Sequence, residues 1–409
     1  MRMINIAVLG YGTVGSGVVK VLETNREKID KKAGVPIRVK YVLDLRDFPG
    51  DPIQEKIVHD YNVILNDPEI KIVVEVMGGL KPAYEFTKAA LEAGKSVCTS
   101  NKELVAEHGS DLLDLAREKN VNYLFEASCG GGIPVIRPLN SSLTAEDIDE
   151  VSGILNGTTN YILSEMTEKG SDFDDALKKA QELGYAERNP EADVEGYDAC
   201  RKIAILSSLA FGKTVKYNTI HTEGITKITP EDITFAKKAD MAVKLLASAN
   251  KTVEEDGSEN FYAMVAPFLV RHGHPLYNIN GVFNAVFVHG NMLGDSLFYG
   301  SGAGSLPTAS AVVGDVVDAV RHLQRTLFVF WDSEELKLSD NGTAVRPFFI
   351  RVPADKKDEA AKLFDAEMVI ECPEIPEEAG IITASMQEND FMKKCDEIHY
   401  VISSIRVNV

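Results

Sequence analysis

The sequence predicts an α/β protein that begins with a doubly wound parallel sheet and continues as a mixed α+β structure. Short apolar runs alternate with amphipathic segments up to about residue 140, which is typical of strands that alternate with helices. Beyond this point the alternation stops and longer helical and extended runs follow. The last stretch, from about residue 345, has the pattern β-α-β-β-α-β, a small module found in many unrelated proteins.

The strands of the parallel part are predicted from short apolar runs, and its helices from apolar residues at helical spacing. Pro82 and Gly94 mark the two ends of one such helix. The expected strands cover residues 4–9, 37–43, 72–76, 96–99 and 122–126, and the expected helices cover residues 15–32, 82–94 and 101–119.

The mixed part contains a strongly apolar helix at residues 199–211 and a glycine-rich loop at residues 300–304. A turn signal at residues 340–342, Asp-Asn-Gly, marks a boundary before the final module. The other expected elements of the mixed part are a strand at 151–155, a long helical stretch to 183, extended runs at 261–269 and 285–289, and a helix from 308 to about 323. The module is expected to have strands at 347–352, 367–371, 380–386 and 400–407, and helices at 356–364 and 389–398.

Composition limits the partners and the compartment. The formal net charge of -19 repels phosphate backbones and anionic lipids, so we expect neither a nucleic-acid nor a membrane partner. The five cysteines are widely spaced without a CxxC pair, which argues against a disulfide framework or a structural zinc site. A reducing, cytoplasmic location is expected, because no signal-peptide pattern and no long apolar span are present.

A glycine-rich turn, Gly-Tyr-Gly-Thr-Val-Gly at residues 10–15, follows the first predicted strand and opens a helix. This is the context in which a GxGxxG motif binds a dinucleotide in a Rossmann-type domain. Gly10 permits the tight turn, Gly12 lets the backbone approach a pyrophosphate, and Gly15 allows close packing of helix and strand. The expected cofactor-binding residues of this turn are Gly10, Gly12, Thr13, Val14 and Gly15.

The second predicted strand carries two charges that bear on the choice of cofactor. Asp44 can hold a ribose 2′-hydroxyl, which favours NAD, although it lies farther from Gly15 than the usual interval of about 20 residues. Arg46 can instead meet a 2′-phosphate, so NAD and NADP both remain possible.

Two further motifs follow strands of the parallel part. Lys102 stands at the carboxyl end of a strand, where ligands bind in such sheets, although a solvated surface lysine is an equally good interpretation. Cys129 precedes three successive glycines and is either a thiolate nucleophile or part of a loop whose carbonyl oxygens hold a monovalent cation. We favour the loop, because no histidine lies near Cys129 in the sequence to activate the thiol.

The densest set of polar residues lies at positions 184–202 and includes Gly184, Glu187 and Asp193. Asp198 and Lys202 are four residues apart and share one face of the predicted apolar helix. A lysine at the edge of an apolar environment is a candidate general acid or base, whereas the alternative is a simple surface ion pair.

The chain resembles the homoserine dehydrogenase family along nearly all of its length up to about residue 330. The order of the motifs is specific to this family. The matching segments are GYGTVG at 10–15, VVEVMGG at 73–79, TSNKELVA at 99–106, FEASCGGGIPVI at 125–136, ILNGTTNYIL at 154–163, GYAERNPEADVEGYDACRK at 184–202, HPLYNINGVFNAV at 274–286 and GSGAGSLPTASAVVGD at 300–315.

The resemblance implies NAD(P)-dependent interconversion of L-aspartate 4-semialdehyde and L-homoserine, in threonine and methionine biosynthesis. It implies that Lys202 is the proton donor and acceptor and that Lys102 is a second catalytic lysine near the nicotinamide. The other implied residues are Glu187, Asp193 and Asp198 for substrate binding, Gly184, Glu187 and Gly302 near the nicotinamide or the substrate, and Glu126, Cys129, Gly131 and Ile133 for a sodium ion held by carbonyl oxygens.

The resemblance also implies three domains and a homodimer or higher homo-oligomer. The dinucleotide-binding domain covers residues 1–140 and is completed by a helix at 308–325, the substrate and dimerisation domain covers 141–307, and an ACT-like regulatory domain covers 345–409. Two positions depart from the family pattern and leave NADP preference and threonine feedback open. Leu43-Asp44 replaces the usual Arg-Asp, and Pro353-Ala354-Asp355 stands where an ACT domain has Asp-x-Pro-Gly.

Two other functions are compatible with parts of the sequence. A phosphorylating semialdehyde dehydrogenase would use Cys129 as its nucleophile and would need a base beside it. A non-catalytic regulator that senses a dinucleotide or an amino acid would leave Glu187, Asp198 and Lys202 without a role.

Overall fold

The computed structural model describes residues 3–408, which fold as two compact units. Both units are discontinuous, because segments from distant parts of the chain build each of them. The first consists of Met1–Glu146, Ala204–Tyr217 and Phe298–Leu336, and the second of Asp147–Ile203, Asn218–Leu297 and Lys337–Val409. Among the described residues, no helix is long and apolar enough to cross a membrane.

The first unit is built on a six-stranded parallel sheet with the strand order β3-β2-β1-β4-β5-β6. The chain leaves β1 first towards one edge and then towards the other, so a topological switch point lies between β1 and β4. The predicted doubly wound parallel sheet is thus confirmed. The strands are β1 (Ile4–Leu9), β2 (Ile37–Leu43), β3 (Ile57–Val58), β4 (Ile70–Glu75), β5 (Ser96–Thr99) and β6 (Tyr123–Leu124).

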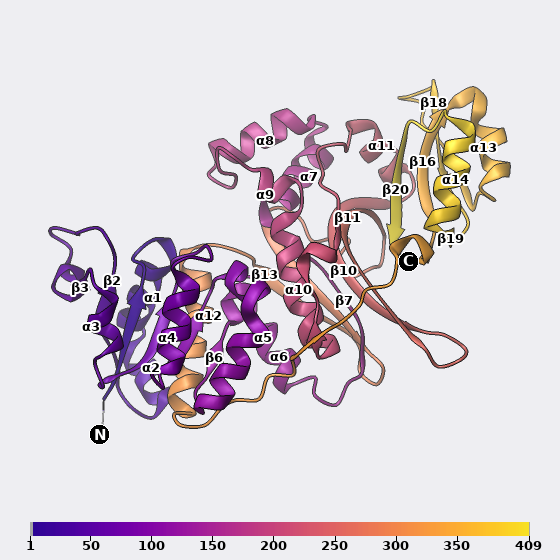
Figure 1. Ribbon diagram of the computed structural model, residues 1–409. Helices are drawn as coiled ribbons and strands as arrows, with labels where there is room; N and C mark the ends of the chain where they lie inside the picture. Colours follow the sequence, from indigo (N-terminus) through magenta and orange to yellow (C-terminus); the bar gives the residue numbers. More distant parts are fainter. Residues whose placement is uncertain (1–2, 409) are drawn as a thin grey trace. The chain divides into compact units, whose positions relative to one another are not determined.

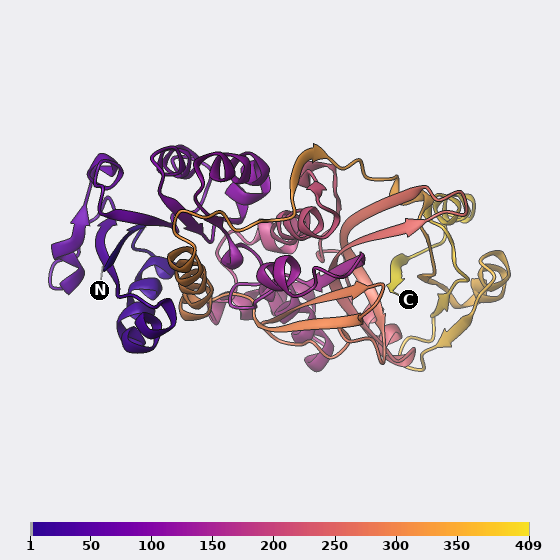
Figure 2. The same ribbon diagram turned by 90° about the horizontal axis from the view of Figure 1, so that it is seen from below.

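Helices cover both faces of this sheet, with α1 beside α12 on one face and α4 beside α5 on the other (Figures 1 and 2). Gly17 permits the close approach of α12, because a Cβ at this position would lie 2.7 Å from the Ser305 Oγ. The single helix predicted at residues 15–32 is wrong in one respect, since it breaks at Asn25 into two helices. The helices of this unit are α1 (Thr13–Thr24), α2 (Arg26–Ala33), α3 (Tyr61–Leu65), α4 (Ala83–Glu92), α5 (Lys102–Lys119), α6 (Ile136–Ser141) and α12 (Ser305–Arg321).

The second unit is built on a mixed sheet in the order β13-β12-β7-β10-β11-β20-β16-β18-β17, with β9 paired to β11. Two long antiparallel strands, β10 and β11, form its central hairpin (Figure 2). The strands are β7 (Ile148–Ile154), β9 (His221–Thr222), β10 (Met241–Val253), β11 (Glu259–Arg271), β12 (Phe283–Gly290), β13 (Gly294–Ser301), β16 (Phe348–Pro353), β17 (Met368–Glu371), β18 (Glu378–Ile382) and β20 (Ser403–Asn408).

The C-terminal module confirms the predicted βαββαβ order, as β16-α13-β17-β18-α14-β20. Its core contains stacked aromatic rings, with Phe348 and Phe391 centroids 3.9 Å apart. The helices of the second unit are α7 (Gly157–Lys169), α8 (Phe173–Glu182), α9 (Glu191–Val194), α10 (Tyr197–Phe211, which continues into the first unit), α11 (Pro230–Lys238), α13 (Lys357–Leu363) and α14 (Glu388–Ile398). Two short strand pairs complete the structure, β8 (Lys213–Thr214) with β14 (Asp332–Glu335), and β15 (Val345–Arg346) with β19 (Met386–Gln387).

Candidate active site

The glycine-rich turn joins β1 to α1 at the switch point of the parallel sheet. Gly10 has φ +95° and donates its N–H to the Leu43 carbonyl at 2.8 Å. A Cβ on Gly15 would lie 1.9 Å from the Gly10 carbonyl oxygen, so only glycine fits there. A Cβ on Gly12 would meet no atom within 4 Å, so this side of the turn is open to a ligand. The unsatisfied amides at the start of α1 then suit a pyrophosphate.

Asp44 and Arg46 lie beside this turn. The Asp44 carboxylate accepts the Tyr11 backbone N–H at 2.8 Å and pairs with the Arg46 guanidinium at 2.9 Å. The Arg46 guanidinium holds the pKa of Asp44 well below its usual range, so the carboxylate is charged at neutral pH. The Arg46 side chain is 62% exposed. The two residues that were expected to determine the preference for NAD or NADP are thus paired with each other beside the turn.

A buried glutamate ties the ends of β4 and β5 together. The Glu75 carboxylate accepts the Thr99 hydroxyl at 2.6 Å and the Met77 backbone N–H at 2.8 Å. Asn101 caps α5 by accepting the Leu104 N–H at 3.1 Å. Lys102, the first residue of α5, therefore stands at the carboxyl edge of the sheet, where it was predicted.

Lys202 and Asp198 form a buried pair at the start of α10. The Lys202 ammonium donates to the Asp198 carboxylate at 2.6 Å and to the Leu155 carbonyl at 2.7 Å. The two residues are only 8% and 4% exposed. The predicted sharing of one helix face is confirmed, whereas the alternative of a surface ion pair is wrong. Two acceptors from different elements hold the ammonium in one place.

Asn156 joins this pair to a second carboxylate. Its side-chain amide donates to Asp193 at 2.7 Å and to Asp198 at 2.9 Å. Its carbonyl oxygen accepts the Thr159 N–H at 2.9 Å and thereby caps α7. Sequence analysis did not single out Asn156 as a site residue. The available signal was an asparagine between a predicted strand and a predicted helix, which is a preferred capping position.

Two residues expected near the nicotinamide or the substrate, Gly184 and Glu187, lie on the loop after α8. Gly184 has φ +75°, and Glu187 is exposed. In the part of the chain that the structure describes, the Glu187 carboxylate is not brought into the hydrogen-bonded network of Asp193, Asp198 and Lys202. The structure therefore assembles three of the four expected acidic and basic groups of this site.

Comparison with known proteins decides the family. The family model of homoserine dehydrogenase matches residues 134–317, and that of the homoserine dehydrogenase NAD binding domain matches residues 10–126. The homoserine dehydrogenase of Synechocystis sp. is 45% identical over 320 residues, which cover 78% of this chain and 73% of the relative. The chain belongs to the homoserine dehydrogenase family. It is therefore an NAD(P)-dependent oxidoreductase.

Solved structures of homoserine dehydrogenases agree with this assignment. The crystal structure of a homoserine dehydrogenase from Thiobacillus denitrificans has a TM-score of 0.90 at 36% identity and covers 100% of this chain and 99% of that chain. A hyperthermophilic archaeal homoserine dehydrogenase mutant in complex with NADPH has a TM-score of 0.64 at 28% identity and covers 78% of this chain and 98% of that chain.

The loop expected to hold sodium in a homoserine dehydrogenase is tightly packed in the first unit. The Glu126 carboxylate accepts the backbone N–H groups of residues 135–137 at 2.6 to 2.9 Å, and these bonds hold its side chain against the start of α6. A Cβ on Gly131 would lie 2.4 Å from the Gly302 carbonyl oxygen, so these two backbones touch. Cys129 is fully buried, which disfavours its use as a nucleophile.

Glu75 is the second residue that sequence analysis missed. It was visible only as a charged residue inside an otherwise apolar strand. Burial raises the pKa of its carboxyl group, while the hydrogen bond from Thr99 acts in the opposite direction. Such a group is placed to fix the ends of β4 and β5, just before Lys102 begins α5.

Proposed function

We propose that the chain interconverts L-aspartate 4-semialdehyde and L-homoserine with Lys202 as the general acid and base. The observation that carries this proposal is the buried Lys202 ammonium, held by Asp198 at 2.6 Å and by the Leu155 carbonyl at 2.7 Å. A positioned ammonium can hand its proton to an oxygen that gains charge during reduction. Nicotinamide, when bound, supplies the hydride to the aldehyde carbon and takes it back in the reverse reaction.

Proton and electron balance requires a proton donor for the oxygen that gains charge, and we assign this role to Lys202. In reduction a C–H bond forms at the aldehyde carbon, and the electron pair of the C=O π bond moves to oxygen. Lys202 then gives a proton to this oxygen, and in oxidation it takes the hydroxyl proton. The negative charge of Asp198 stabilises the ammonium form of Lys202, which donates the proton in reduction and is formed again in oxidation.

The remaining residues are proposed to bind the amino acid and the cofactor. Asp193 and Asp198, joined by Asn156, offer negative charge to the substrate ammonium group, and Glu187 would add a third carboxylate from its exposed loop. Lys102 is proposed to act near the nicotinamide.

The cofactor is proposed to be NAD or NADP, with Asp44 facing the ribose of NAD and Arg46 facing the phosphate of NADP. The other expected cofactor contacts are Gly10, Gly12, Thr13, Val14, Gly15, Gly184 and Gly302.

A sodium ion is proposed to bind main-chain oxygens of the loop at residues 126–133. Replacing sodium by choline in the assay buffer should lower activity, whereas unchanged activity would argue against the site.

We also propose a cytoplasmic homodimer or higher homo-oligomer with an ACT-like regulatory domain at residues 345–409 and the domain boundaries expected from the sequence. Light scattering in solution tests the oligomeric state, and a monomeric mass would contradict this part of the proposal.

The decisive test of the mechanism is the variant Lys202→Ala. It should keep nicotinamide cofactor binding, measured by fluorescence titration, and lose turnover of homoserine by roughly 100-fold or more. Lys244→Met is the matched control, because Lys244 is a buried lysine of the same unit that donates to Ile279 and Asn280 instead. Turnover close to wild type in Lys202→Ala would remove Lys202 from the mechanism.

A further inference from the structure

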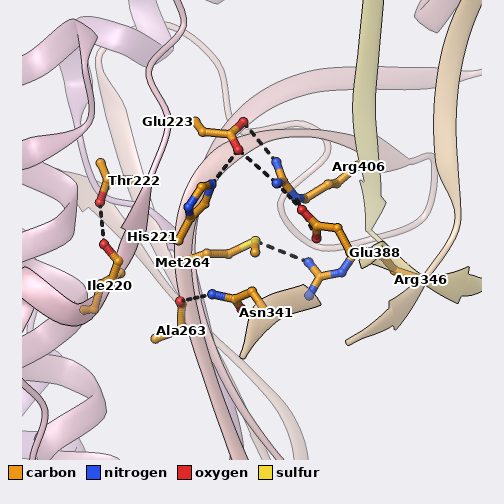
Figure 3. Close-up of polar contacts among 10 residues, drawn as sticks. All are labelled: Ile220, His221, Thr222, Glu223, Ala263, Met264, Asn341, Arg346, Glu388 and Arg406. Carbon is orange, nitrogen blue, oxygen red and sulfur yellow. Dashed lines mark hydrogen bonds and ion pairs between the residues drawn. The ribbon is translucent and has the colours of Figure 1, made fainter. Parts of the chain in front are cut away.

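Arg406 of β20 is the largely buried centre of a charge cluster between the C-terminal module and the rest of the second unit (Figure 3). Its guanidinium donates to both Glu223 carboxylate oxygens, at 3.0 and 2.9 Å, and to both Glu388 carboxylate oxygens. The Arg406 side chain is 11% exposed, and those of Glu388 and Glu223 are 12% and 41% exposed. His221 adds a contact of 2.5 Å to Glu223. One cation therefore holds two carboxylates that would otherwise repel each other.

Glu223 belongs to a short strap, residues 222–225, that packs against the segment leading into α10. The Ile225 N–H donates to the Val194 carbonyl at 2.9 Å. A Cβ on Gly224 would lie 2.3 Å from the same Val194 oxygen, so the two backbones are in direct contact. Gly196 has φ +83°, and a Cβ on it would lie 3.4 Å from the Glu223 carbonyl oxygen. The strap thus fixes the path of residues 194–196.

This path carries the proposed substrate carboxylates. Asp193 directly precedes the contact with the strap, and Asp198 follows it by a few residues at the start of α10. Asn156 joins both carboxylates, and Asp198 holds Lys202. A shift of the strap would therefore be passed to the carboxylates within a few peptide units.

We propose that Arg406 is a positioning residue, which fixes the substrate carboxylates through Glu223 and the strap. This inference rests on the proposed function of Asp193, Asp198 and Lys202. The C-terminal module then takes part in homoserine binding without touching the substrate. Misplacement of a binding group by about 1 Å can cost roughly 100-fold in rate, so loss of the Arg406 pair should be measurable in the kinetics.

The test is Arg406→Met, assayed by steady-state oxidation of homoserine. We expect kcat/KM for homoserine to fall about tenfold or more, mainly through KM, with the KM of the nicotinamide cofactor changed less than about twofold. A merely structural role would lower the amount of active enzyme and hence kcat, but would leave the KM for homoserine unchanged. An unchanged KM in a folded variant therefore overturns the proposal.

Three further variants sharpen the test. Glu223→Gln should reproduce the rise in KM. Combining it with Arg406→Met should add little, because both substitutions break the same contact between Arg406 and Glu223. Glu388→Gln leaves the strap contact intact and should change the KM much less. Arg351→Met is the matched control, since Arg351 is a 4% exposed arginine of the same module that pairs with two other carboxylates, Asp232 and Glu378.

Each outcome decides between the alternatives. An equal rise in KM in Arg351→Met would overturn the proposal, because the effect would then follow from loosening the module. If Arg406→Met does not fold, Arg406→Lys should show an intermediate KM, because lysine keeps the charge but loses the forked geometry. Wild-type protein that does not oxidise homoserine would instead contradict the proposed function, so the two failures are distinguishable.

Discussion

Asp44 and Arg46 place opposite charges beside the glycine-rich turn, and each favours a different cofactor. Replacing Asp44 by alanine removes the charge that repels a 2′-phosphate and the acceptor for a ribose hydroxyl, so the kcat/KM ratio of NADP to NAD should rise. Replacing Arg46 by alanine should lower the same ratio. Initial rates with both cofactors check this prediction, and a ratio that moves in the same direction in both variants would contradict it.

Asn156 combines a structural and a functional role that substitutions can separate. Asn156→Ala removes the cap of α7, which should lower the free energy of unfolding by about 1 kcal/mol, and it also removes the bridge between Asp193 and Asp198. Asn156→Ser keeps a capping oxygen but not the amide bridge. We expect both variants to have a raised KM for homoserine and only Asn156→Ala to be less stable in urea unfolding. A wild-type KM in Asn156→Ser would show that the bridge is unimportant.

For single residues of the candidate site, the sequence predicts only contacts between positions that are close together in the chain. Asp198 and Lys202 could be paired because four residues separate them on one helix. The Leu155 carbonyl and Asn156 could not be assigned to the same cluster, because they reach it from a different strand and helix. Residue spacing carries no information on which strand end faces which helix.

Among the secondary-structure elements, the turn between β1 and α1 offers a pair of glycines with different constraints. Gly12→Ala meets no atom within 4 Å, so stability should stay within about 1 kcal/mol of wild type while cofactor affinity falls about tenfold. Gly15→Ala would press its Cβ against the Gly10 carbonyl and should cost about 1–3 kcal/mol. Thermal unfolding and fluorescence titration of the nicotinamide cofactor measure the two effects. Equal destabilisation of both variants would contradict this division.

Most predicted elements are confirmed within a few residues. The long helical stretch expected to end at residue 183 is wrong, because it breaks at Gly170 into α7 and α8. Strand β10 was not predicted, for a physical reason. Its sequence is rich in alanine and includes Lys244, which does not suggest a buried strand. The Lys244 ammonium is buried because the Ile279 carbonyl and Asn280 side chain accept from it, at 2.6 and 2.7 Å. Burial lowers the pKa of Lys244 to about 8. The compensating acceptors lie far along the chain, so the strand could not be predicted locally.

For the whole molecule, the stability of the contact between the C-terminal module and the rest of the second unit should depend on pH. Burial alone would raise the pKa of Glu223, but hydrogen bonds from His221 and Arg406 lower it to about 2, from an ordinary value of 4.5. A lowered pKa stabilises the folded state above about pH 4.5, and this contribution is lost as the pH falls towards about 2. Urea unfolding across this range should therefore lose less stability in Glu223→Gln than in wild type. Parallel losses in the two proteins would contradict this prediction.

The pairing of β20 with β11 is the part of the architecture that the sequence did not predict. The module was expected to be a separate domain, and its internal strand and helix order is confirmed. Its last strand, however, runs parallel to β11, with Arg406 opposite Phe268. The sequence of an edge strand does not reveal which strand it will pair with. Its unpaired backbone N–H and C=O groups can bond to those of any other exposed edge.

Helix α12 returns to the first unit after the chain has built much of the second, and it closes the face of the sheet that α1 begins. A ribosome must therefore synthesise residues 305–321 before the nucleotide-binding fold can be complete. Until then the apolar cluster between this sheet and α1 lacks the α12 residues Ala309, Val312, Val313 and Val316, so the last part of the chain to join this core is made well over 100 residues after β6.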